Sequence, residues 1–74
     1  MNKADFLREL EKIIEASPGT LDGREELSAL DGWDSMAAMG FIAMVDSRLG
    51  VMVSPSSLAE SRTVADLMHL AGVK

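Results

Sequence analysis

Apolar side chains in the N-terminal part of the chain recur at the spacing of one helical face. Charged residues occupy the other face between Asn2 and Ala16, and the apolar positions are Phe6, Leu7, Leu10, Ile13 and Ile14. This pattern predicts an amphipathic helix over 2–16 with Asn2 as its N-cap, and it places Glu11 on the face that points away from the core. The Ser-Pro-Gly sequence at 17–19 predicts the end of the helix.

Residues 17–34 form a long connection to the next helix. Glycines interrupt the connection, and its leucines, which are expected to anchor it on the core, are Leu21, Leu27 and Leu30. Its charge is mostly acidic, with one arginine against the carboxylates of Asp22, Glu25, Glu26, Asp31 and Asp34. A connection of this length in a small domain usually has a function or contains a short helical turn.

A second helix is predicted over Ser35–Leu49, where no proline interrupts a run rich in Ala, Met and Leu. Asp34 and Ser35 supply polar groups that can cap its start, and Gly50 follows as a C-terminal stop. The core-facing positions of this helix are expected to be Ala38, Phe41, Ile42, Val45 and Leu49.

The C-terminal part of the chain predicts a short helix and a longer one. Residues 51–53 alternate like a strand without a partner, so an extended link is expected there. A Ser-Pro pair at 54–55 then opens a short helix through Glu60, anchored by Leu58. Thr63, with an acid three residues later, predicts a capped helix that ends at Gly72. The predicted fold class is all-α, a four-helix bundle around a single core in one domain over 1–74.

Composition narrows the range of functions. A chain of 74 residues that is 47% hydrophobic supports one small core and leaves little room for a dedicated enzyme site. The absence of cysteine excludes disulfides, a thiolate zinc site and a cysteine nucleophile. A net charge of −5 disfavours nucleic acid and an anionic membrane surface, and it favours a basic protein partner. Charged residues occur throughout the N-terminal part of the chain, so no apolar secretory segment and no membrane-inserted segment is expected there. A cytoplasmic protein is therefore expected.

Few side chains are available for catalysis, so the chain is not expected to be an enzyme. The single histidine, His69, lies in the last turn of the predicted fourth helix, where the helix dipole favours a solvated imidazole. Asp31 and Asp34 lack the alternation of acids found in calcium loops, so no intrinsic metal site is expected.

The segment Asp-Gly-Trp-Asp-Ser-Met at 31–36 stands where the acidic connection meets the second helix. In one interpretation, Asp34 and Ser35 only cap the helix and Trp33 packs on the edge of the core. In the other, the Ser35 hydroxyl carries a phosphate or a phosphodiester, which would lie over free backbone N–H groups at the positive end of the helix.

Three segments resemble a known family. They are Leu-Asp-Gly-Trp-Asp-Ser-Met at 30–36, Leu-Gly-Val at 49–51 and Thr-Val-Ala-Asp-Leu at 63–67. With them, the chain from Phe6 to Ala71 resembles the acyl carrier protein family, whose members hold 4'-phosphopantetheine on a serine. The resemblance implies that Ser35 carries this cofactor and that acyl groups are held as thioesters on its thiol. The lack of cysteine fits, because the reactive sulfur then belongs to the cofactor.

The same resemblance implies the partners. A phosphopantetheinyl transferase that uses coenzyme A and Mg²⁺ would install the arm, and Asp34 would help to hold the metal and the docking register. The loaded carrier, expected to be a monomer, would deliver its thioester to acyl-loading and acyl-processing enzymes without catalysing a reaction itself.

The second helix departs from the family pattern. Many members carry acids along its exposed face, whereas this chain has none between Ser35 and Asp46. The exposed, partner-binding face is expected to consist of Met36, Met39, Gly40 and Ala43. Glycine inside a helix costs about 1 kcal/mol of stability relative to alanine. Its presence at position 40 therefore indicates either a close approach by another backbone or simple drift of the sequence.

This departure favours a specialised carrier, serving a polyketide, lipid-modification or aminoacyl pathway, over the usual fatty acid synthase partnership. Two alternatives remain open. One is an aminoacyl or peptidyl carrier with the same arm. The other is an unmodified helical interaction module in which Ser35 only caps a helix and the acidic connection binds a basic partner.

Overall fold

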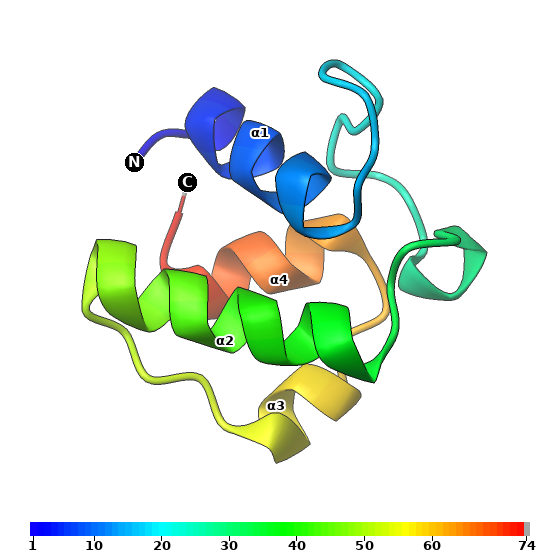
Figure 1. Cartoon of the computed structure of the whole chain (residues 1–74). Coiled ribbons are helices and arrows are strands. Elements are labelled where there is room, and N and C mark those ends of the chain that lie inside the picture. Colours follow the sequence, from blue (N-terminus) through cyan, green and yellow to red (C-terminus); the bar gives the residue numbers. More distant parts are fainter. Residues whose placement is uncertain (74) are drawn as a thin grey trace.

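The computed structural model describes residues 1–73, and its regular elements are helical (Figure 1). They are α1 (Lys3–Ile13), the 3₁₀ turn η1 (Leu27–Ala29), α2 (Ser35–Leu49), α3 (Pro55–Ala59) and α4 (Val64–Ala71). Glu26 and Thr63 form an isolated antiparallel bridge, and no strand is formed by the described residues. The all-α prediction is confirmed. No helix in this part of the chain has the length and apolar content needed to cross a bilayer.

The first helix starts as predicted but ends earlier. The Asn2 side chain accepts a hydrogen bond from the Asp5 N–H at 2.8 Å, as expected of an N-cap. The helix was predicted to continue to Ala16, yet it ends at Ile13, because Glu15 adopts a left-handed conformation with φ 61°. That turn sends the chain away from the helix axis and into the long connection.

Glu11 is buried, so the prediction that it points away from the core is wrong. Only 1% of its surface is exposed. Its carboxylate accepts hydrogen bonds from the backbone N–H groups of Gly19 at 3.1 Å and Leu21 at 2.8 Å, and it pairs with the Arg8 guanidinium. Burial disfavours the charge, but these donors outweigh it and hold the pKa of this carboxyl below its usual value. Glu11 therefore fastens the connection to α1.

The connection contains the short helical turn that its length suggested. Leu21 and Leu27 are buried anchors, and Leu30 is half-buried. The Leu27 N–H donates to the Arg62 carbonyl at 2.8 Å, which joins the turn to the residues before α4. The connection thus runs over the ends of α1 and α4 before it enters α2 at the right of Figure 1.

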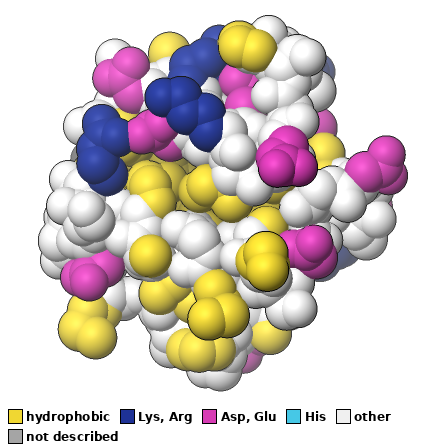
Figure 2. Space-filling model, in the orientation of Figure 1, with side chains coloured by type: hydrophobic (Ala, Val, Ile, Leu, Met, Phe, Trp, Pro, Cys, Tyr) yellow, Lys and Arg dark blue, Asp and Glu magenta, His cyan; other side chains and the backbone are white. Residues whose placement is uncertain are grey.

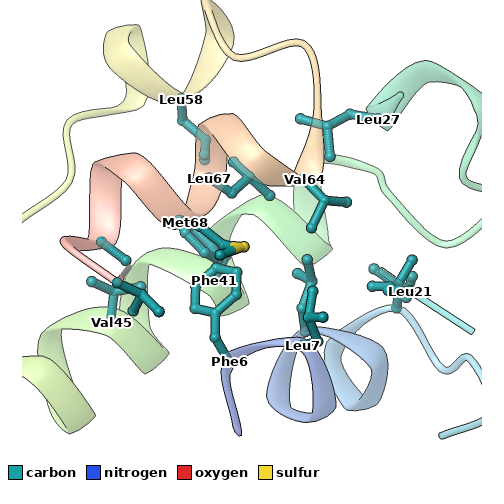
Figure 3. Packing of buried hydrophobic residues seen from close by; sticks show 14 of the residues in the cluster. Phe6, Leu7, Leu21, Leu27, Phe41, Val45, Leu58, Val64, Leu67 and Met68 are labelled. Atoms are coloured by element: carbon teal, nitrogen blue, oxygen red, sulfur yellow. The ribbon is translucent and has the colours of Figure 1, made fainter. Parts of the chain in front are cut away.

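The core lies where α1, α2 and α4 converge, with Leu58 of α3 closing it on one side (Figure 3). Phe6 and Phe41 are fully buried and meet edge to face, with ring centroids 5.9 Å apart. Such pairs add about 0.5–1.5 kcal/mol beyond the burial of their area. The buried set includes Ala37, which the predicted stripe of the second helix did not contain.

The caps of the later helices agree with the sequence. The bounds of α2 are those predicted, and Gly50 ends it in the left-handed region at φ 66°. The third helix has Ser54 as its N-cap and proline in its first turn, and it stops one residue before the predicted Glu60. Thr63 and Asp66 form a complete capping box at the start of α4.

Candidate functional site

The start of α2 is organised by Asp34. Its carboxylate Oδ1 accepts a hydrogen bond from the Ala37 N–H at 2.8 Å, so Asp34 is the N-cap of the helix. Within residues 1–73 the second oxygen, Oδ2, has no hydrogen-bond partner. The backbone N–H groups of Ser35 and Met36 also have none within this range, as is normal for the first turn of a helix. At the start of α2, one carboxylate oxygen and two backbone donors thus have no hydrogen-bond partner within residues 1–73.

Ser35 occupies the first position of α2 and is exposed. Among the described residues, none exchanges a hydrogen bond with its hydroxyl. The hydroxyl therefore stands at the mouth of the helix without an internal role in the fold, where an enzyme can reach it.

An apolar hollow begins at Ser35 and follows α2 on the side of α3. It encloses about 480 Å³ and is lined by Trp33, Asp34, Ser35, Ala38, Met39, Ile42, Pro55, Leu58 and Ala59. A second hollow of about 310 Å³ is lined by Met39, Ile42, Ala43, Asp46, Met52 and Val53. The two share Met39 and Ile42, and we call them together the α3-side groove.

Trp33 forms one end of this groove. Its ring packs edge to face on Phe41 with centroids 6.2 Å apart, and its side chain is only half-buried. Trp33 therefore packs on the edge of the core, as one of the two interpretations of this segment expects. The tryptophan thereby links the wall of the groove to the centre of the core.

Methionines surround the same region. Met36, Met39 and Met52 are 81%, 71% and 90% exposed, and hydrophobic side chains gather over α2 and α3 in the lower half of Figure 2. Ala43 is exposed as expected, but Gly40 is half-buried, because it lies near Ile13 of α1. Met52 was not among the predicted site residues. The alternation at 51–53 could have indicated it, because in an extended segment the Met52 side chain points away from the side that carries Val51 and Val53.

A second groove, which sequence reasoning missed, lies on the other side of α2. It encloses about 440 Å³ and is lined by Ile13, Ile14, Glu15, Asp31, Gly32, Asp34, Met36, Ala37 and Gly40. We call it the α1-side groove. Its residues come from the end of α1, the connection and α2, so only the folded chain brings them together.

The charges around the two grooves are acidic. None of the ion pairs formed by the described residues involves Glu15, Asp31 or Asp34. Arg48 and Lys12 both pair with Glu9, and together they hold the pKa of that carboxyl below its usual value, with the Lys12 hydrogen bond as the largest cause. Lys12 is the cation closest in sequence to Glu15, and Arg24, which pairs with Asp22, is the closest to Asp31 and Asp34, so these cations are engaged elsewhere.

The remaining titratable candidates lie outside these grooves. His69 is exposed in the last turn of α4, as predicted, and it does not line either groove. In the part of the chain that the structure describes, no three His, Cys, Asp or Glu side chains are grouped in a way that could hold a metal ion. The start of α2 is therefore the candidate site.

Comparison with known proteins identifies the family to which the chain belongs. Residues 4–71 match the family model described as "Phosphopantetheine attachment site". The matched range begins in the first turn of α1 and ends with the last residue of α4, so it includes all the residues of both grooves. Comparisons with curated proteins and with solved structures give no significant match.

Proposed function

Because the chain belongs to the phosphopantetheine attachment site family of carrier proteins, we propose that Ser35 is the residue that holds the 4'-phosphopantetheine arm. Members of this family are carriers and not enzymes, so the chemistry on the cargo is done by partner proteins. When bound, the arm supplies a thiol that holds the cargo as a thioester. The proposed carrier domain extends over 1–74.

The observation that carries this assignment is the exposed hydroxyl of Ser35 at the first position of α2, which exchanges no hydrogen bond with another of the described residues. A phosphodiester on this oxygen would lie beside the unpaired N–H groups of Ser35 and Met36, where the helix dipole favours negative charge. Ser47 also follows an aspartate but lies in the interior of α2, where no such donors are free. The residues present therefore fit the group.

Asp34 is proposed to act twice. Oδ1 caps α2 and fixes the position of Ser35, while Oδ2 has no partner among residues 1–73 and is open to the Mg²⁺ of the transferase. In the transfer, the Ser35 oxygen attacks the phosphorus of coenzyme A that bears the pantetheine group. The pyrophosphate P–O bond breaks, adenosine 3',5'-bisphosphate leaves, and the hydroxyl proton is lost to the transferase. Asp34 holds the reacting oxygen in place and contributes negative charge to the metal.

The proposed cargo is an acyl group. The α3-side groove opens at Ser35 and is lined by apolar side chains such as Ala38, Ile42 and Leu58. Apolar surface of this kind favours an acyl chain over an aminoacyl group, whose ammonium would lose hydration there. The lack of acids between Ser35 and Asp46 supports a specialised carrier instead of the usual fatty acid synthase partnership.

The proposed partners are a phosphopantetheinyl transferase and the acyl-loading and acyl-processing enzymes that follow it. They would dock on the exposed apolar face formed by Met36, Met39 and Ala43, with Gly40 at its edge toward α1. A cytoplasmic monomer is the proposed working form.

The test is intact mass after incubation with coenzyme A, Mg²⁺ and a broad-specificity phosphopantetheinyl transferase. We expect one phosphopantetheine to be added to the wild type and to the control Ser47→Ala, and none to Ser35→Ala. Modification of Ser35→Ala would show that the site is elsewhere. Failure of the wild type with several transferases would contradict the carrier function.

A further inference from the structure

We propose that Trp33 is a positioning residue for the arm, and that its indole ring seats the pantoyl part of the arm, with its two geminal methyl groups, in the α3-side groove. This inference rests on the proposed function, because it needs the arm on Ser35. Three features of the site carry it: the placement of Trp33, the chemistry of its ring and the tether at Ser35.

Trp33 is held in place by the core but is not covered by it. It lies directly before Asp34, the N-cap of α2, and forms one end of the α3-side groove. Its ring packs edge to face on Phe41 with centroids 6.2 Å apart, yet the side chain is only half-buried. The uncovered part of the ring borders a hollow of about 480 Å³. A large aromatic ring that is fixed on one side and open on the other is a preformed surface for a ligand.

The indole N–H of Trp33 is available as a donor. Within residues 1–73 it has no hydrogen-bond partner, and every buried side-chain nitrogen in that range has one, so the Trp33 nitrogen is not buried. The ring therefore offers an apolar surface together with a single N–H donor. The pantoyl group has the matching composition, because its carbon with two methyl groups is followed by a hydroxyl and an amide carbonyl, which accept hydrogen bonds.

The tether identifies the occupant of this end of the groove. Ser35 lines the same hollow as Trp33 and follows it by two positions. In 4'-phosphopantetheine, one methylene group separates the phosphate from the carbon that bears the two methyl groups, whereas the cargo is attached at the far end. The pantoyl group is thus the first apolar part of the arm, and its attachment gives it a high effective concentration at Trp33. Neither Ser35 nor an aromatic side chain of the described residues lines the α1-side groove.

The first experiment uses the wild-type chain as its own probe, because Trp33 is its single tryptophan. The transferase loads the chain either with coenzyme A or with a coenzyme A analogue in which hydrogen atoms replace the two geminal methyl groups. Each product is verified by intact mass and purified away from the transferase. Tryptophan emission and its quenching by acrylamide are then compared between the unloaded chain and the two loaded forms.

We expect loading with coenzyme A to shift the emission to shorter wavelength and to lower the acrylamide quenching constant about twofold, because the seated arm covers the ring. The analogue should lose most of this effect, since two methyl groups, each equivalent to a buried CH₂, change the equilibrium between seated and extended arm about tenfold. The control is the double variant Trp33→Phe/Ala65→Trp, whose tryptophan stands on an exposed position of α4 outside the grooves. Its emission should be the same before and after loading.

The second experiment observes the arm. Coenzyme A labelled with ¹³C in the geminal methyl groups is used for loading, and the methyl signals are recorded by nuclear magnetic resonance. In the wild type, the ring current of Trp33 should move these signals from their positions in free coenzyme A, with nuclear Overhauser effects to the indole protons. Trp33→Leu, which keeps an apolar side chain, should remove both effects. Met36→Leu alters the exposed neighbour of Ser35 that lines the α1-side groove, and it should keep them.

A loaded wild type with the emission of the unloaded chain and the methyl shifts of free coenzyme A would overturn the inference and leave the carrier function intact. Equal changes with coenzyme A and its analogue would overturn it too, because the phosphate would then be responsible. A change that appears only after acylation would assign the groove to the cargo alone. If Trp33→Leu is misfolded, the comparison of the two arms on the wild type decides. A wild type that is not loaded contradicts the proposed function, and the inference falls with it.

Discussion

Replacing Glu11 tests whether one buried carboxylate holds the long connection in place. Glu11→Ala removes the acceptor for the backbone N–H groups of Gly19 and Leu21 and the partner of Arg8. The Leu21 bond is buried, and an unsatisfied buried donor costs about 1–3 kcal/mol. The Arg8 side chain is 42% exposed, so water screens its ion pair and that contact adds at most about 1 kcal/mol.

Together these contacts predict a loss of roughly 2–4 kcal/mol in the free energy of unfolding, a large part of the total for so small a domain. Urea unfolding followed by circular dichroism measures it. Glu9→Ala is the control, because Glu9 lies on the same helix and pairs with Lys12 and Arg48, but accepts no bond from the connection. We expect about 1 kcal/mol or less for this control. A Glu11→Ala variant no less stable than Glu9→Ala would refute the reasoning.

The same residue predicts a pH dependence. The pKa of Glu11 is lower in the folded chain than in the unfolded chain, so its stabilisation is present above the ordinary value of about 4.3. It is lost as the pH falls from that value through the folded pKa. Glu9, Asp22 and Asp66, whose pKa values are lowered too, act in the same direction. Between pH 7 and pH 3, Glu11→Gln should therefore lose less stability than the wild type, and an equal loss would contradict the assignment.

Three further substitutions address the site. Asp34→Ala removes a cap worth about 1 kcal/mol, and we expect the loading rate, measured by intact mass, to fall further than this loss explains; wild-type loading would leave Asp34 as a cap only. Met39→Glu should keep the melting temperature and speed dissociation from an acyl-processing partner in surface plasmon resonance, since full burial of that side chain is worth roughly 1.5–3 kcal/mol; unchanged or tighter binding would refute an apolar interface. Gly32→Ala should lower the melting temperature in calorimetry far more than Gly40→Ala, because a Cβ at position 32 would lie 2.1 Å from a backbone oxygen, whereas a Cβ at position 40 would meet only a side chain. Similar shifts in the two variants would contradict this account of their packing.

Elements defined by their own caps could be predicted from the sequence. The start of α2 depends on the Asp34 side chain and an N–H three residues later, and its end on Gly50. The capping box at Thr63 and Asp66 is equally local. Such contacts join residues only a few positions apart, so they are visible as short patterns.

Features set by distant contacts could not be predicted in this way. The early end of α1 coincides with the packing of Gly32 against the Ile14 carbonyl, a contact between residues that the sequence does not connect. Glu11 looked like a solvated residue, and only the fold of the connection over it supplies the donors that make its burial favourable. The motif around Ser35 located the proposed attachment point, but the grooves beside it depend on Met52, Leu58 and Glu15, which belong to other segments.

The side chains of α2 differ in how strongly the core constrains them, because few of them are fully buried. Its buried positions are Ala37, Phe41 and Val45, which form one narrow stripe. The connection is instead fixed from α1 by Glu11 and from α4 by the backbone bonds around Glu26 and Thr63. The partly buried residues on the flanks of α2 also pack against the core, and they are Ala38, Ile42, Met44 and Leu49. The exposed side chains of Met36, Met39 and Ala43 are less constrained by internal packing. Substitutions at these three exposed positions can therefore alter partner binding at little cost in stability, whereas the core stripe cannot change in this way.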